Sequence, residues 1–173
     1  MKKLLSILLV ILLAYGCAPQ KGAINFEKIF FHTSRCFGYC PIYHLQVNKD
    51  QTLLLSKEET LRNAKQSAMT QGPTTIEYFK GSVNNADFKI LLNELAKTDT
   101  LDIKGETCCD GSLKTIIAFY SGKRRVVQTM FPPKEGENLI AILMKICQSQ
   151  NLVKTEKFEL EESAPPELDA DKK

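Results

Sequence analysis

The chain has 173 residues, of which 43% are hydrophobic and 25% are charged, an ordinary composition for a globular protein. This length supports one domain with its own apolar core and argues against two domains. The formal net charge of +3 is small, so the composition does not predict a nucleic-acid-binding protein.

The first seventeen residues have the organisation of a secretory leader. Lys2 and Lys3 form a short basic start, and the apolar run Leu4–Leu13 follows. This run is too short to cross a bilayer core, which requires about 20 residues. A small residue directly precedes Cys17, so the segment resembles a bacterial lipoprotein leader. The resemblance implies that residues 1–16 are removed and that Cys17 carries the lipid.

The predicted lipid defines the surroundings of the mature chain. It makes the membrane a partner, with residues 17–23 as the lipidated cysteine and a short tether. Because Ala18 is not an acidic inner-membrane retention signal, we expect the bacterial cell envelope, at the outer membrane and facing the periplasm. This oxidising compartment favours disulfides. Nucleic acid is not an expected partner there.

Four strands are predicted in the first half of the chain. β-Forming residues dominate Phe26–Thr33, and apolar and polar side chains alternate in Tyr43–Val47, as in a strand with one buried face. Leu53–Leu55 begins the next strand, and Ile76–Phe79 is a further short one. The polar residues 57–73 between them are predicted to form a loop.

Two helices and a hairpin are predicted in the second half. Asn84 or Asn85 is the expected N-cap of the first helix, and Pro132-Pro133 opens the second. Between the helices, Ser121-Gly122-Lys123 is typical of the turn of a β-hairpin. The apolar stripes with helical spacing are Phe88, Leu91, Leu92, Leu95 and Ala96, and then Leu139, Ile140, Leu143, Ile146 and Cys147.

This order of elements predicts an α+β fold over residues 24–154. We expect a single domain, with an antiparallel sheet of five or six strands and two helices packed on one face. Residues 155–173 contain seven acidic residues against three lysines and few apolar residues. They are therefore predicted to form a disordered acidic tail.

The most specific motif is the octapeptide Cys36–Tyr43, Cys-Phe-Gly-Tyr-Cys-Pro-Ile-Tyr. It resembles the Cys-Phe-Gly-x-Cys-Pro-x-Tyr hallmark of an uncharacterised family of bacterial exported and lipoprotein domains, a domain of unknown function. The resemblance extends from about Ile29 to Val153, and Asp110 matches a second position. It implies that the motif joins the first two strands, and it implies no established activity.

The first interpretation of this loop is a structural disulfide. Gly38 permits a positive φ at the tip of the turn. Cys36 and Cys40 lie on its two arms, within reach of the Cα spacing of about 5.5–6 Å that a disulfide prefers. Phe37 and Tyr39 flank the tip and would either form a contact surface for a partner or cover the disulfide.

The second interpretation is a metal or thiol-redox site. The spacing around Gly38 is symmetrical, so His32 would face His44 and Cys36 would face Cys40. All four share one parity and hence one sheet face, and two thiolates with two imidazoles suit copper or zinc. Four residues of a strand span about 13 Å, so a histidine would reach the ion of the thiolates only across a bulge.

The remaining cysteines leave the disulfide pairing open. Cys108 and Cys109 are adjacent and would point to opposite sides of an extended chain. Cys147 is either a partner for one of them or a small buried apolar residue. With Cys17 set aside for lipid, the odd number of cysteines leaves at least one without a partner in the chain.

These features favour a non-enzymatic, lipid-anchored binding module that contacts an envelope protein or ligand through the Cys36–Cys40 hairpin. Two alternatives stay open: a copper- or zinc-binding or thiol-redox lipoprotein that uses Cys36 and Cys40, and a purely structural lipoprotein. The sequence has no Gly-x-Ser-x-Gly, His-Glu-x-x-His or phosphate-binding glycine motif. An enzyme is therefore not predicted, and the favoured interpretation requires no cofactor.

Overall fold

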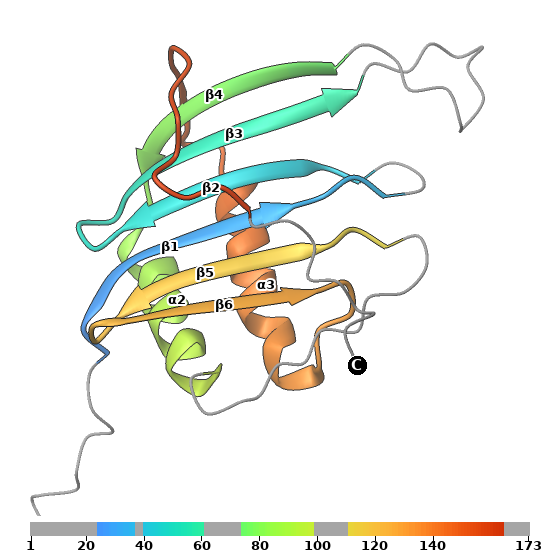
Figure 1. Cartoon of the computed structure of the whole chain (residues 1–173). Helices are drawn as coiled ribbons and strands as arrows, with labels where there is room; N and C mark the ends of the chain where they lie inside the picture. The colour runs from blue at the N-terminus through green and yellow to red at the C-terminus, as the bar shows by residue number, and fades with distance from the viewer. Residues whose placement is uncertain (1–23, 37–39, 61–73, 99–110, 165–173) are drawn as a thin grey trace, which may run out of the picture.

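The computed structural model describes residues 24–36, 40–60, 74–98 and 111–164. Within them lies one antiparallel sheet of seven strands in the order β6-β5-β1-β2-β3-β4-β7. Figure 1 shows both helices on one face of this sheet. The predicted α+β fold is confirmed, with seven strands where five or six are predicted. The elements are β1 (Phe26–Thr33), β2 (Ile42–Asn48), β3 (Thr52–Thr60), β4 (Thr74–Ser82), α2 (Asn85–Thr98), β5 (Lys114–Tyr120), β6 (Lys123–Thr129), α3 (Lys134–Cys147) and β7 (Val153–Lys154).

β1 lies in the middle of the sheet and is buried on both faces. Ile29 and Phe31 belong to the core beneath the helices, whereas Phe30 and His32 lie on the opposite face, which we call the outer face. All four residues are at most 3% exposed. Alternate residues of a strand point to opposite faces, so this strand has cover on both sides.

The core beneath the helices is built from the stripes that helical spacing predicts. α2 and α3 pack together, and their apolar residues meet alternate residues of the central strands. The five predicted stripe residues of α3 are all buried. In α2, Ala96 is exposed and Thr98 is buried instead, so the buried face of α2 is rotated slightly from the predicted stripe.

α2 begins at an Asn84 cap, one of the two predicted caps. Asn84 Oδ1 accepts from the backbone N–H of Asp87 at 2.9 Å, and Asn84 Nδ2 donates to the Asp87 carboxylate at 2.8 Å. Lys145 of α3 donates to the same carboxylate at 2.6 Å, and this hydrogen bond holds the pKa of Asp87 below its usual range. The start of α2 is thereby tied to α3.

The structure extends one predicted strand and confirms the predicted hairpin. β3 continues to Thr60 because it pairs with β2 and β4 on its two sides, so residues 57–60 belong to the sheet and not to the predicted loop. Residues 61–73 lie outside the described residues. The predicted hairpin joins β5 to β6 through Ser121 and Gly122, both with positive φ.

The C-terminal strap, residues 155–164, crosses the outer face after β7 has paired with β4, and Figure 1 shows it in front of the sheet. Its Phe158 ring contacts Tyr78 edge-on, with ring centres 5.2 Å apart. The structure therefore differs from the predicted disordered tail over 155–164. Residues 165–173 lie outside the described residues.

Acidic side chains hold the strap to the sheet. Glu161 pairs with Lys28, and its carboxylate also accepts from Gln46 Nε2 at 2.7 Å. Glu162 pairs with Arg124 at 3.1 Å. The strap has too few apolar residues to form a core of its own. Its acidic side chains instead pair with basic and amide groups on the outer face. None of the helices in the described part of the chain is both long and apolar enough to span a membrane.

Candidate functional site

A row of polar side chains crosses the outer face at right angles to the strands. Neighbours in the row are paired residues in the sheet register, and the row is Gln128, Thr115, His32, His44, Ser56 and Tyr78. Its centre is nearly as buried as the core, because His32 and Thr115 are each 3% exposed. Buried polar groups require hydrogen-bond partners, so this row is the first place to look for a ligand.

At the centre of the row, Glu58, His44 and His32 form a chain of contacts. Glu58 Oε1 lies 3.3 Å from His44 Nε2, and His44 Nδ1 lies 3.0 Å from His32 Nδ1. Because an ionised carboxylate only accepts, the hydrogen of His44 is assigned to Nε2. His44 Nδ1 is then an acceptor, and His32 Nδ1–H donates to it.

This assignment leaves a lone pair on His32 Nε2. That atom is buried and has no hydrogen-bond partner among the residues that the structure describes. Burial, followed by the neighbouring His44, lowers the pKa of His32 from 6.5 to about 4, while Glu162 of the strap acts in the opposite direction. The ring of His32 is therefore neutral in neutral solution.

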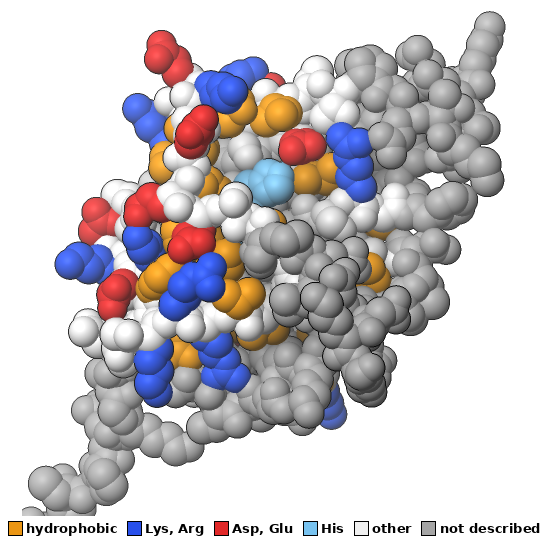
Figure 2. Space-filling model, viewed as in Figure 1, with side chains coloured by type: hydrophobic (Ala, Val, Ile, Leu, Met, Phe, Trp, Pro, Cys, Tyr) orange, Lys and Arg blue, Asp and Glu red, His pale blue; other side chains and the backbone are white. Residues whose placement is uncertain are grey.

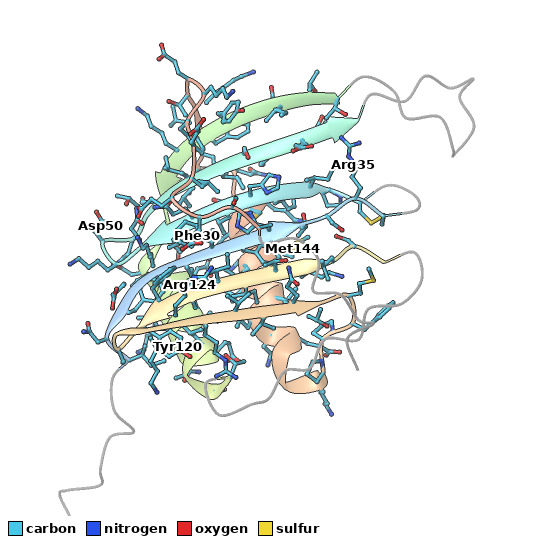
Figure 3. All side chains as sticks on the ribbon, in the orientation of Figure 1. Phe30, Arg35, Asp50, Tyr120, Arg124 and Met144 are labelled. Carbon is cyan, nitrogen blue, oxygen red and sulfur yellow. A yellow bond between two sulfur atoms is a disulfide. The ribbon has the colours of Figure 1, made fainter. Side chains whose placement is uncertain are left out.

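Arg35 connects this cluster to the cysteine hairpin. Its guanidinium lies 3.7 Å from Glu58 Oε2 and donates to Thr74 Oγ1 at 3.3 Å. Figure 3 shows Arg35 at the end of the sheet where β1 ends and β2 begins. In Figure 2 a histidine ring reaches the surface of the outer face, with acidic and basic side chains nearby. The side chain of His44 is 31% exposed, so the cluster is accessible from solvent.

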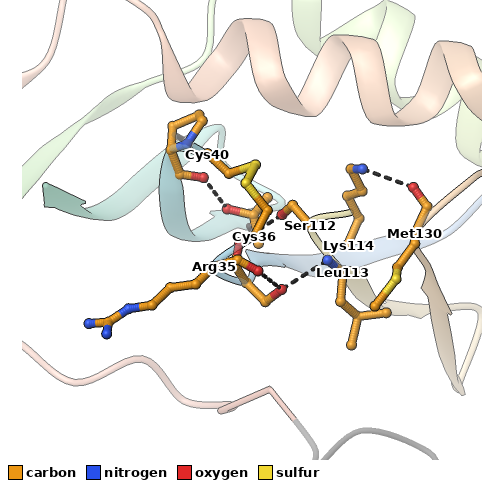
Figure 4. Close-up of a disulfide and its surroundings, with 10 residues drawn as sticks. Arg35, Cys36, Cys40, Ser112, Leu113, Lys114 and Met130 are labelled. Carbon is orange, nitrogen blue, oxygen red and sulfur yellow. Dashed lines mark hydrogen bonds between the residues drawn. A yellow bond between two sulfur atoms is a disulfide. The ribbon is translucent and has the colours of Figure 1, made fainter. Parts of the chain in front are cut away.

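The hairpin between β1 and β2 is closed by Cys36 and Cys40, which lie at disulfide distance (Figure 4). Their Cα atoms are 5.7 Å apart, within the range that a disulfide prefers. Thr33 braces both arms, because its hydroxyl donates to Pro41 O at 2.9 Å and accepts from Tyr43 N at 2.8 Å.

A second set of hydrogen bonds ties the hairpin to the start of β5. Ser34 N donates to Leu113 O at 2.9 Å, and Leu113 N donates to Ser34 Oγ at 2.9 Å. Ser112 Oγ donates to Ser34 O at 2.8 Å. The base of the hairpin is therefore fixed to the start of β5, which makes it a firm support for the residues at its tip.

The double variant Cys36→Ser/Cys40→Ser is expected to lose about 2 kcal/mol of unfolding free energy, the chain-entropy effect of opening so small a ring. Urea denaturation of the wild type and the variant measures this difference. Wild-type protein treated with a strong reductant is the control and should match the variant. Equal midpoints for the oxidised wild type and the variant would contradict a stabilising disulfide.

The structure keeps the two predicted pairs separate. His32 faces His44, as the spacing predicts, and Cys36 pairs with Cys40. Among the described residues, no three His, Cys, Asp or Glu side chains come together in a group that could hold a metal ion. Cysteines joined in a disulfide supply no thiolate, so the four predicted ligands do not form one site.

The other predicted residues fall into two groups. Cys147 is a free and fully buried thiol, and burial raises its pKa to about 12. It is thus a small apolar residue of the core, one of its two predicted roles. The predicted site residues outside the described part of the chain are Cys17, Phe37, Tyr39, Cys108, Cys109 and Asp110.

Glu58 and Arg35 belong to the site but are not among the predicted site residues. Glu58 is two residues beyond Ser56, the partner of His44, and so lies on the same face of the sheet. The register between β2 and β3 would have identified Glu58. That register requires β3 to extend beyond Leu55, which the polar composition of residues 57–60 does not predict.

The fold and the site define a small α+β domain with a disulfide-closed hairpin and, on the outer face, a contacting pair of histidines of which His32 is buried and His44 is partly exposed. The chain belongs to the family described as domain of unknown function DUF6438, which matches residues 27–146. Membership of an uncharacterised family is thus confirmed over most of the predicted domain. No curated protein and no solved structure matches the chain.

Proposed function

We propose that the protein is a lipid-anchored component of the bacterial envelope, and that its domain is a non-enzymatic binding module. The contact surface is the Cys36–Cys40 hairpin with the adjoining outer face. The observation that carries this proposal is the bracing of the hairpin base by Thr33 and Ser34. A contact surface whose base is held in place before binding loses less conformational entropy when it meets its partner.

The path of the chain supports this placement. The proposed lipid on Cys17 lies only a few residues before β1, which begins at Phe26. β1 then runs across the sheet, about 26 Å for a strand of this length, before the hairpin begins. Figure 1 accordingly shows the start of β1 and the β1–β2 hairpin at opposite ends of the sheet. The end of the sheet at which β1 begins, on the side of the proposed anchor in sequence, is therefore opposite the end that carries the hairpin.

The partner contact is tested with the variant Phe37→Ala/Tyr39→Ala, compared with Phe131→Ala. Phe131 is 50% exposed in the described part of the chain, so its variant controls for the loss of an exposed aromatic ring. Cross-linking of the membrane-bound chain in intact cells should give a reproducible partner. The double variant should reduce its yield at least about tenfold, equivalent to about 1.4 kcal/mol of binding free energy.

Three outcomes decide between the proposals. An unchanged yield from the double variant excludes the hairpin tip as the contact. Absence of any cross-linked partner favours the purely structural lipoprotein. A Cys17→Ser chain that remains in the membrane fraction, or a mature chain whose mass includes no lipid, excludes the anchor.

The pairing of Cys36 with Cys40 favours one second candidate, a thiol-redox role. This role requires the pair to be reduced under mild conditions, whereas a structural disulfide resists the glutathione pool. Alkylation of the native protein in a series of glutathione buffers distinguishes the two. Reduction only below about −300 mV excludes the redox role.

A further inference from the structure

The C-terminal strap places two adjacent carboxylates on the outer face, and side chains from three strands receive them. Glu161 contacts Lys28 of β1 and Gln46 of β2. Glu162 accepts from Arg124 of β6 twice, from Nε at 3.4 Å and from Nη2 at 3.1 Å. Such a two-point contact is how a guanidinium recognises a carboxylate with a defined orientation. Figure 2 shows acidic and basic side chains next to one another on this face.

Gln46 contacts the strap as a peptide and not only as a charge. Its Nε2 donates to the Glu161 carboxylate at 2.7 Å, and its Oε1 accepts from the Glu161 backbone N–H at 3.3 Å. Nε2 also donates to Asn48 Oδ1 at 3.0 Å, so both amide hydrogens have an acceptor. Gln46 is 3% exposed, which fixes its orientation. This buried amide suits an extended acidic segment of a protein better than a simple anion.

The sheet itself orients the two cations. Lys28 Nζ lies 5.3 Å from the centre of the Phe119 ring, and Arg124 Cζ lies 5.9 Å from the same centre. Both distances are within the range of a cation–π contact. Phe119 belongs to β5 and is paired in the register with Lys28 on one side and Arg124 on the other. The positive surface is therefore held in place by the strands as well as by the strap.

The strap is attached more loosely than the strands beneath it. None of residues 155–164 is buried. The backbone hydrogen bond that joins it to the sheet beyond β7 runs from Thr155 N to Tyr78 O at 2.8 Å. The side chain of Glu161 is 55% exposed, and that of Arg124 is 45% exposed. Exposed ion pairs contribute little to stability, so the strap can leave the surface while the sheet stays folded.

We propose that the outer face around Lys28, Gln46 and Arg124 binds an extended acidic segment of a partner protein, and that the strap occupies this surface until the partner displaces it. The surface lies within the family domain, residues 27–146, whereas the strap lies beyond it. The inference rests on the proposed binding function and names the chemistry of the partner. It does not depend on the aromatic residues of the hairpin tip.

The test uses the purified full chain and a fluorescent peptide with the sequence of residues 155–164. In the wild type the tethered strap competes at an effective concentration on the order of millimolar. Glu161→Gln/Glu162→Gln releases the strap, so this variant should bind the peptide at least about tenfold more tightly than the wild type does. The matched control, Glu156→Gln/Glu159→Gln, removes the same charge at exposed positions outside these ion pairs and should bind as the wild type does.

A further variant tests the receiving side chains. Adding Lys28→Gln/Arg124→Gln to the released chain should return peptide binding to the wild-type level. Equal binding by the wild type and the released chain, or binding that persists without the two cations, overturns the proposal. Equal binding of the released chain to vesicles of anionic phospholipid also overturns it, because that result shows attraction to charge without recognition of a peptide.

The wild-type chain decides by itself if a variant does not fold. Excess unlabelled peptide should shift the nuclear magnetic resonance signal of the Glu161 amide in the labelled chain to that of a free strap, and an unchanged signal overturns the proposal. Light scattering should give one chain per particle. Dimers that exchange their straps would make a second copy the occupant and overturn it too.

Cross-linking in intact cells separates this inference from the proposed function. The released variant should increase the yield of the cross-linked partner, and Lys28→Gln/Arg124→Gln should lower it. A partner whose yield ignores both changes overturns the inference and leaves the proposed function standing. Tight peptide binding without any cross-linked partner supports the surface and contradicts the proposed function.

Discussion

Phe30→Ala is expected to lower the free energy of unfolding by about 3–5 kcal/mol, as much as Phe31→Ala. The two rings lie on opposite faces of β1, and both are 0% exposed. Phe30 packs edge-on against Phe119 with ring centres 6.1 Å apart, and Lys28 Nζ lies 6.0 Å from the centre of its ring. Figure 3 shows Phe30 in the middle of the sheet. The outer face therefore has a buried apolar layer of its own.

Chemical denaturation of the two variants beside Phe131→Ala measures this effect. Phe131 is half exposed, so its removal should change stability by no more than about 0.5 kcal/mol, as at other surface positions. A loss for Phe30→Ala as small as that of Phe131→Ala would show that the outer face is open to solvent. It would also remove the reason for the low pKa of His32.

Acidification from pH 6.5 to about 4 is expected to remove about 3 kcal/mol of stability through His32 alone. In the unfolded chain this imidazole takes up a proton near its ordinary pKa of 6.5, whereas in the folded chain its pKa is about 4. Between these values the unfolded state binds more protons, so stability falls as the pH falls. His44 and Glu162 are the charged or titratable groups whose fields act on the ring.

The control is His32→Gln, which should flatten the dependence of unfolding free energy on pH between 6.5 and about 4.5. Asp87 and Glu161 also have lowered pKa values, set by Lys145 and Lys28, but their contributions are lost only as the pH falls below their ordinary values near 4. Equal slopes for wild type and variant in the upper part of the window would show that His32 is not the group responsible.

Local sequence patterns predict the parts of the fold that depend on neighbouring residues. The alternation in Tyr43–Val47 predicts β2, and the helical spacing from Leu139 predicts α3. The symmetrical spacing about Gly38 predicts that His32 faces His44, which the register confirms. Each of these predictions needs only a period or a turn.

The strap shows why other parts could not be predicted. Glu161 is 133 residues away from Lys28 in sequence, so no short-range period connects them. The acidic composition predicts a disordered tail because it lacks an apolar face. The outer face supplies opposite charges at the required positions, and that arrangement exists only once the sheet has formed.

The contacting pair of histidines could be predicted only in part, for a related reason. Spacing identifies the two rings, but the burial of His32 depends on what covers the outer face. Glu58 becomes a neighbour of His44 only through the register of β3, whose C-terminal half is polar. Burial and register are properties of the assembled sheet, and a single sequence does not contain a local signal for them.

The two edges of the sheet have consequences for how copies of the protein meet. β7 pairs with β4 and covers part of one edge. Within the described part of the chain the sheet ends on its other side at β6, which begins with Lys123, Arg124 and Arg125. Edge strands invite pairing between molecules, and positive charges oppose it. Copies that meet at this edge would therefore repel each other near the start of β6, which opposes aggregation by strand addition.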